Sequence, residues 1–155
     1  MNNGANELEL IAALLREEST LALATTDGQG EACVAPLFYI ADEQLSLYWL
    51  SSEASLHSQN LKRSPKATAA VYRHADHWKD IRGVQMGGLV TTIKEQERRS
   101  MLLKVYCERF QLGAIFALVV SQSTLYMLRP SYFRYIDNSR AFAQKFEITI
   151  QGNSD

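Results

Sequence analysis

The residues best suited to chemistry lie where an alternating apolar run gives way to small hydroxyl side chains. Residues 45–50 alternate as a strand does, and Ser51, Ser52 and Ser55 follow them, ahead of a short helical segment that ends at Ser64-Pro65. The first turn of a helix carries unpaired backbone N–H groups and the positive end of the helix dipole. We expect this junction either to bind an anion such as phosphate or, more simply, only to cap the helix.

Other familiar catalytic patterns are absent from the sequence. There is no Gly-x-Gly-x-x-Gly after a strand, no Walker loop, no Gly-x-Ser-x-Gly elbow and no evident pair of acid–base carboxylates. The segment His74-Ala75-Asp76-His77 has two imidazoles, but it lacks a third ligand at useful spacing, so we interpret it as a solvated loop. We therefore predict no metal site and assign no catalytic residue.

Charge and composition exclude several classes of protein. The chain has 155 residues with 16 Lys and Arg against 17 Asp and Glu, so its net charge of -1 argues against a nucleic-acid partner. The apolar run at residues 114–120 is too short to cross a bilayer, and acidic Glu7 and Glu9 replace the basic start of a signal peptide. With Cys33 and Cys107 read as buried thiols, we expect a cytoplasmic protein without membrane partners.

Periodicity predicts one domain over residues 7–151, between a disordered lead-in at 1–6 and a tail at 152–155. The expected helices span residues 7–18, 53–63 and 94–110, with a short one within 111–123. The expected strands span residues 20–26, 31–40, 45–51, 66–73, 83–93, 124–137 (one or two strands around Pro130) and 143–150. This order favours a mainly β (α+β) fold, an antiparallel barrel of about six to seven strands decorated by helices.

An ordered set of short motifs resembles a known family. Val34-Ala35-Pro36, residues 48–51, the run from Asn60 to Pro65 and the run from Gly83 to Gly88 follow one another as in the pyridoxamine 5'-phosphate oxidase-like FMN-binding split barrels. The resemblance covers about residues 7–150. It is strongest to the small, uncharacterised YhbP-like bacterial group, through residues 81–85, Asp137-Asn138 and residues 142–145.

The resemblance implies a homodimer with two flavin sites in its interface. The phosphate would lie at the strand-to-helix junction, and the isoalloxazine against the backbone of residues 34–36. Gln85 would approach the ring or the ribityl chain, although alternation also allows it to point to solvent. Gly88 would allow a close backbone approach, although a Gly87-Gly88 pair in a strand more often marks a bulge than a ligand contact. The implied cofactor-binding residues are Val34, Ala35, Pro36, Ser51, Ser52, Ser55, Leu56, His57, Asn60, Gln85 and Gly88.

Two departures from the family pattern limit what the resemblance implies. The two positions after Ser55 are usually basic, but here they are Leu56 and His57. If His57 holds a phosphate, affinity should fall as the pH rises through the pKa of its imidazole. The end of the chain also lacks the Arg-Leu-His-like substrate motif of pyridoxamine-phosphate oxidase, so vitamin B6 oxidation is not expected.

Four functions remain open at this stage. The leading one is an FMN-dependent oxidoreductase with an unknown small-molecule substrate, in which the flavin carries the redox chemistry by hydride transfer at N5. The alternatives are flavin storage or sensing without turnover, haem binding through His57, His74 or His77, and a ligand-free dimer whose site has decayed. FAD or a deazaflavin would be alternatives to FMN.

Overall fold

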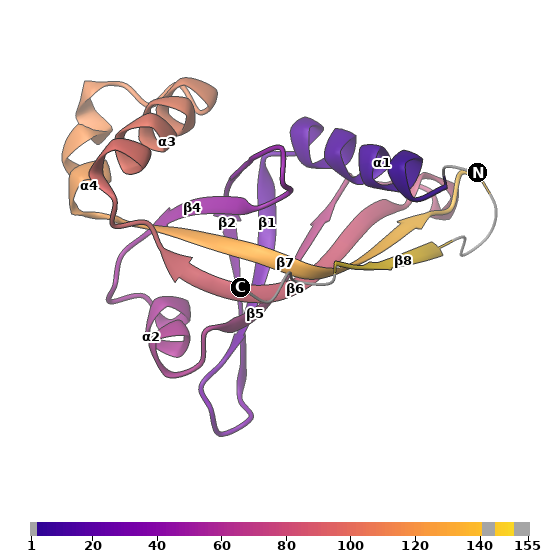
Figure 1. Ribbon diagram of the computed structural model, residues 1–155, viewed down its shortest axis with the longest axis horizontal. Helices are drawn as coiled ribbons and strands as arrows, with labels where there is room; N and C mark the ends of the chain where they lie inside the picture. Colours follow the sequence, from indigo (N-terminus) through magenta and orange to yellow (C-terminus); the bar gives the residue numbers. More distant parts are fainter. Residues whose placement is uncertain (1–2, 141–144, 151–155) are drawn as a thin grey trace.

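The computed structural model describes residues 3–140 and 145–150 (Figure 1). Four α-helices and two short 3-10 helices connect and cover the strands of a single sheet. The helices are α1 (Asn3–Glu17), α2 (Leu56–Arg63), η1 (Trp78–Asp80), α3 (Gln96–Arg109), η2 (Ala114–Phe116) and α4 (Ala117–Gln122). The strands are β1 (Thr20–Thr26), β2 (Ala32–Phe38), β3 (Ile40–Ala41), β4 (Leu47–Ser51), β5 (Lys66–Tyr72), β6 (Arg82–Thr92), β7 (Thr124–Asp137) and β8 (Lys145–Thr149).

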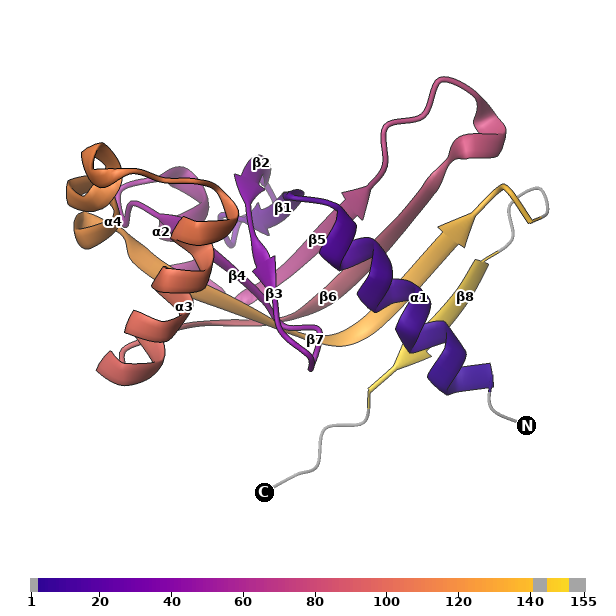
Figure 2. The same cartoon turned by 90° about the horizontal axis from the view of Figure 1, so that it is seen from above.

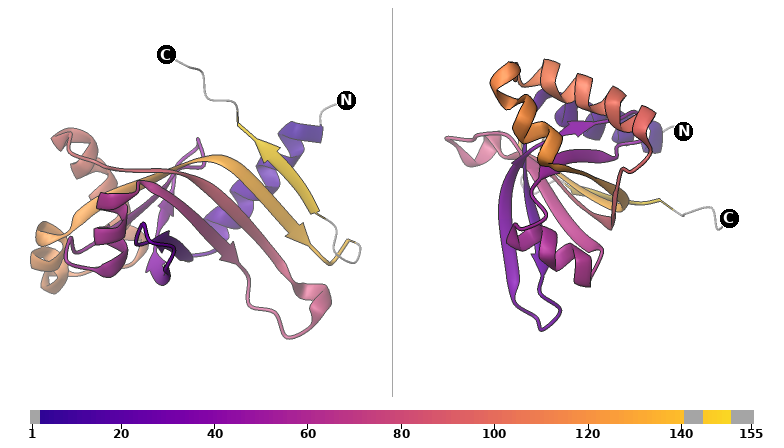
Figure 3. Two further views of the ribbon diagram at one scale, coloured as in Figure 1. Left: turned by 90° about the horizontal axis from the view of Figure 1, so that it is seen from below. Right: turned by 90° about the vertical axis from the view of Figure 1, so that its left-hand side faces the viewer.

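The sheet is antiparallel throughout and curls into an open barrel. Its strand order is β2-β1-β5-β6-β7-β4-β3, and β8 pairs with β7. β2 ends the order on one side, yet it comes close to β4 without pairing with it. This opening between β2 and β4 is called the split below. Within the split barrel, α2 packs against β1 and reaches β2 (Figure 3).

Strict alternation along the strands builds the main core. Leu21 and Leu23 of β1 and Val84 and Met86 of β6 point inward, while the residues between them face the other side of the sheet. Trp49 is fully buried in the same cluster. The apolar stripe of α1 closes this core from above, and α3 covers a second, smaller cluster at the other end of the molecule (Figure 2).

Two side chains distant in sequence satisfy the C-terminal carbonyls of α1. The Tyr39 hydroxyl donates to the Leu15 carbonyl at 2.9 Å. The Arg109 guanidinium, at the end of α3, donates to the carbonyls of Arg16 and Glu18, each at 2.8 Å. Helix ends leave such carbonyls without intrahelical partners, so these bonds fix where α1 stops.

The fold agrees with the sequence interpretation, with corrections at element ends. The antiparallel split barrel is confirmed, and an eighth strand arises because the run 31–40 breaks at Tyr39 into β2 and the two-residue β3. Residues 124–137 form one strand. α1 begins at Asn3, so residues 3–6 are helical rather than a disordered lead-in, since no proline interrupts the segment. The expectations for residues 1–2, 141–144 and the tail at 152–155 lie outside the described residues.

Candidate functional site

Three serines converge at the junction between β4 and α2. Ser51 ends β4, where it pairs with Thr124 of β7, and Ser55 is the N-cap of α2. The two hydroxyl oxygens lie 3.1 Å apart, and Ser55 also donates to Ser58 Oγ at 2.8 Å. The helix begins at Leu56 rather than at residue 53, because residues 52–55 form a turn closed by Ser55 N–H donating to the Ser52 carbonyl.

His57 is part of this cluster, not a surface cation. Its side chain is buried, with Nε2 2.7 Å from Ser51 Oγ and 3.1 Å from Ser55 Oγ. Burial lowers the pKa of His57 below its ordinary value, so the imidazole is neutral at pH 7. This argues against the expectation that His57 grips a phosphate as a cation; its place is that of a neutral hydrogen-bond partner for the serines.

The first turn of α2 keeps free donors. The backbone N–H groups of Leu56 and His57 have no hydrogen-bond partner among the described residues, whereas Ser58 N–H is capped by Ser55. The Leu56 side chain is 59% exposed at the position where the family pattern has a cation. The junction therefore offers backbone and hydroxyl donors that fit a phosphate group, but no compensating positive charge from Leu56 or His57.

A cation near this loop is already compensated. Glu53, within the loop, pairs with Lys62 of α2 at 2.7 Å and accepts a hydrogen bond from the Thr124 hydroxyl at 3.1 Å. These contacts tie the loop to α2 and β7. The positive charge of Lys62 is balanced by Glu53, so the pair as a whole offers no net positive charge to an anion in the junction.

Asn60 lies away from the serine hydroxyls. Its side chain is almost completely buried, and its Nδ2 donates to Thr25 Oγ1 of β1 at 3.2 Å. Its Oδ1 has no hydrogen-bond partner among the described residues. The structure thus places Asn60 between α2 and β1, where it positions the helix.

Residues 34–36 border the split. They belong to β2, whose one edge pairs with β1 and whose other edge faces no paired strand. Val34 is 65% exposed, and Pro36 also faces outward. Because Pro36 has no N–H to donate, an end strand is where it is tolerated. The free edge of β2 and the serine junction of β4 and α2 therefore flank the same opening.

Gln85 and Gly88 lie on β6, in different surroundings. Gln85 is exposed on the face opposite Val84 and Met86, in a cavity of about 390 Å³ that Tyr72 and Arg73 also line. The alternative interpretation of Gly87-Gly88 as a bulge is confirmed by a register shift at this point. The close approach that Gly88 allows is to β7, since a Cβ there would overlap the carbonyl of Arg129. One chain alone does not bring Gln85 or Gly88 to the serine junction.

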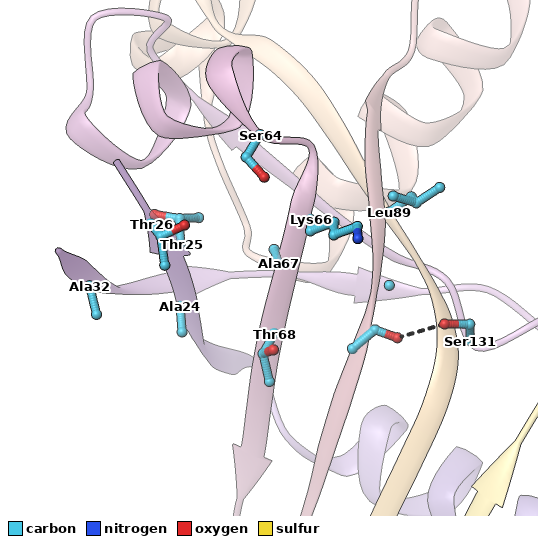
Figure 4. A pocket seen from close by; sticks show the side chains of 12 residues that line it. Ala24, Thr25, Thr26, Ala32, Ser64, Lys66, Ala67, Thr68, Leu89 and Ser131 are labelled. Atoms are coloured by element: carbon cyan, nitrogen blue, oxygen red, sulfur yellow. Dashed lines mark hydrogen bonds between the residues drawn. The ribbon is translucent and has the colours of Figure 1, made fainter. Parts of the chain in front are cut away.

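A cavity of about 680 Å³ in the described chain was not predicted from the sequence (Figure 4). It opens over β1, β5 and β6, near the C-terminal end of α2. The outward positions Lys66 and Thr68 of β5 were the available signal, because they alternate with buried Ala67 and Ala69. The sequence alone does not show that this face forms a cavity, because the cavity depends on the register between the strands.

The described residues contain no cluster of three or more His, Cys, Asp or Glu side chains able to hold a metal ion. No helix in residues 3–140 and 145–150 has the length and apolar character needed to cross a membrane.

Comparison with known proteins places the chain in a family. The sequence model described as pyridoxamine 5'-phosphate oxidase matches residues 8–137. A UPF0306 protein of Enterobacter sp. (strain 638) is 28% identical over 118 residues, which cover 76% of this chain and 79% of that protein.

Solved structures agree on the fold. ChuZ of Campylobacter jejuni matches with a TM-score of 0.80 and 15% identity, over 96% of this chain and 61% of that one. HutZ, a haem storage protein of Vibrio cholerae, matches with a TM-score of 0.68 and 18% identity, over 91% of this chain and 92% of that one. A haem-binding protein of Mycobacterium smegmatis matches with a TM-score of 0.73 and 17% identity, over 96% of this chain and 59% of that one. This chain therefore spans only about three-fifths of the length of ChuZ and of the Mycobacterium smegmatis protein. Because the family model matches most of the chain and the solved structures share its fold, this chain belongs to the pyridoxamine 5'-phosphate oxidase-like split-barrel family.

Proposed function

We propose that this chain is a homodimeric flavoprotein that binds FMN at the split and acts as an oxidoreductase on a small molecule other than a B6 vitamer. One observation carries the proposal. The free N–H groups of Leu56 and His57 and the hydroxyls of Ser51 and Ser55 form an anion cradle beside the open edge of β2. A flavin held there would supply hydride transfer, for which the protein needs no acid–base residue of its own.

The serine–histidine cluster would prepare the cradle for a phosphate. In the tautomer of His57 that carries its proton on Nε2, the imidazole donates to Ser51 Oγ. The Ser51 O–H is then free to donate to a phosphate oxygen. The backbone N–H groups at the start of α2 would donate alongside it, as helix N-termini do at phosphate sites. The unpaired backbone edge of Val34 to Pro36 would meet the polar edge of the ring.

The proposed dimer accounts for residues that one chain leaves apart. Gln85 lies outside the split of its own chain, so it would reach a flavin only from a second copy. Val34, 65% exposed on the end strand of the sheet, is an apolar contact for such a copy. The dimer is therefore part of the proposal and would complete the site.

The test is the absorption spectrum of the purified protein before and after adding FMN and desalting, joined to a pair of variants at Leu56. Leu56→Glu adds a negative charge at the first helical position, which suits the helix dipole, while Leu56→Gln is its neutral control. We expect Leu56→Glu to weaken the binding of FMN at least tenfold. The affinity for riboflavin, which lacks the phosphate, should be unchanged. Equal loss of both flavins, or no flavin retained by the native protein, would refute the phosphate cradle.

Haem is the second candidate ligand, and a specific cavity favours it. His74 lines the 390 Å³ cavity together with Tyr72, Ile81 and two arginines, Arg73 and Arg82. An imidazole beside apolar side chains and cationic groups suits an iron porphyrin with its propionates. A Soret band after adding haem, lost in His74→Ala and kept in His77→Ala, would support this candidate. A spectrum identical to that of free haem would reject it.

A further inference from the structure

A second cavity lies apart from the cradle, toward the other end of α2. Its lining comes from β1, β2, β5, β6, β7 and the residue that follows α2: Ala24, Thr25, Thr26, Ala32, Ser64, Lys66, Ala67, Thr68, Gly87, Gly88, Leu89 and Ser131 (Figure 4). None of these residues is Ser51, Ser55 or His57. Its volume of about 680 Å³ lies within the range of small-molecule sites.

The floor of this cavity includes several very small residues. It is formed by sheet backbone carrying side chains no larger than methyl groups at Ala24, Ala32 and Gly87. Gly87 pairs with Thr68, and a Cβ added to it would meet only ordinary contacts, the nearest at 3.8 Å. The absence of a side chain there is therefore not forced by packing. A floor of such small groups leaves room for the face of a conjugated ring.

The charge of the cavity comes from one residue. Lys66 is the only charged residue among those lining it, and its ammonium makes no ion pair or hydrogen bond with any described residue. The hydroxyls of Ser64, Thr26 and Thr68 likewise make no side-chain hydrogen bond with another described residue, and they lie around the same hollow (Figure 4). A cation among neutral donors suits a carboxylate.

A buried polar group lies next to the same wall. Thr25, nearly fully buried, lines the cavity and accepts a hydrogen bond from Asn60. The Asn60 side chain, itself almost completely buried, leaves its Oδ1 unpaired. Asn60 does not itself line the cavity, so it supports Thr25 from behind this wall.

We propose that this cavity is a binding site for a planar aromatic carboxylate, with the ring on the floor at Gly87 and the carboxylate on Lys66. The site is separate from the cradle at the split. It requires no flavin, so it stands or falls independently of the proposed cofactor.

The direct test uses 2-naphthoate as the probe and its neutral amide, 2-naphthamide, as the matched ligand. Binding is followed by ¹H–¹⁵N chemical shifts of the full chain. We expect 2-naphthoate to shift the amides of residues 66–68 and 87–89 and to bind at least tenfold more tightly than the amide. Lys66→Met should lower the affinity for 2-naphthoate to that of the amide, and Lys104→Met, on exposed α3, should change nothing.

A steric variant tests the floor without depending on charge. Gly87→Leu fills the hollow from a position that has room for a Cβ, so the variant should fold and should bind neither ligand. Circular dichroism and sedimentation check its fold and its state of association. Equal affinity for the two ligands, shifts confined to other strands, or unchanged binding in Lys66→Met would overturn the proposal. A native protein that binds neither ligand while Gly87→Leu alters its association would show instead that this face is covered by another copy.

Discussion

Replacing Gly88 by alanine should cost the protein much more stability than the same replacement at Gly87, one residue earlier. A Cβ at Gly88 would overlap the Arg129 carbonyl oxygen and lie 2.8 Å from its carbon and 2.9 Å from Pro130 Cα. All three are backbone atoms, so β6 and β7 must separate at the bulge. Overpacking costs about 1–3 kcal/mol, and each stretched ladder bond about 1 kcal/mol, which gives a loss of about 3 kcal/mol.

Thermal unfolding measures this difference directly. For a chain of this size, about 3 kcal/mol lowers the melting temperature by about 6–12 °C. Gly87→Ala is the control, since the nearest atoms would lie 3.8 and 3.9 Å from its Cβ. It should raise stability by about 0.5 kcal/mol, because alanine restricts the unfolded chain. If the two variants melt within 2 °C of each other, the two strands do not approach as closely as described.

Three further outcomes follow from charges and titrating groups. Leu56→Arg should tighten FMN binding roughly three- to tenfold in low salt, measured by quenching of flavin fluorescence. The gain should disappear in 1 M NaCl, where the screening length is only about 3 Å. An unchanged affinity would contradict the argument that a cation is missing at this position. Because burial lowers the pKa of His57, the unfolded chain takes up a proton near pH 6.5 (about the ordinary value) that the folded chain does not. The free energy of unfolding should therefore fall as the pH drops from neutral through that range toward the pKa of the folded state. Urea unfolding should show that this pH dependence is absent in His57→Gln and kept in His74→Gln. Burial raises the pKa of Asp137, but hydrogen bonds from Ser139 and the charges of Arg82 and Arg140 outweigh it and lower the pKa overall, so its contribution should be lost as the pH falls below about 4. Asp137→Asn should shift the acid-unfolding midpoint accordingly, and an unmoved midpoint would show that the carboxylate contributes nothing.

Alternation made the sheet predictable from the sequence. Leu21, Leu23, Val84 and Met86 each follow the two-residue period of a strand with one buried face, and each is buried. The start of α2 was less predictable, because Ser52 and Ser55 are both good caps. Only the pairing of Ser51 with Thr124, which ends β4, and the turn that follows it decide between them.

The burial of the cluster at α2 could not be inferred from hydrophobic periodicity. His57, Ser58 and Asn60 are polar, yet they form most of the buried side of this helix, with Leu61 as the apolar member. A polar helix is normally expected on the surface. Here the sheet curls around the helix. The local sequence therefore predicts the helix but not its surroundings, and the neutral state of His57 depends on those surroundings.

The two carbonyls at the end of α1 that Arg109 satisfies have a consequence for synthesis on the ribosome. Arg109 is 93 residues beyond Arg16 and 91 beyond Glu18, so α1 leaves the ribosome long before Arg109 has been synthesised. At about 5–20 residues per second the delay is about 5–20 s. During that interval the apolar stripe of Ile11, Leu14 and Leu15 has no finished sheet to cover. α1 is thus made well before the side chain that satisfies its end, and it depends on Arg109, in the last third of the sequence, to complete its docking.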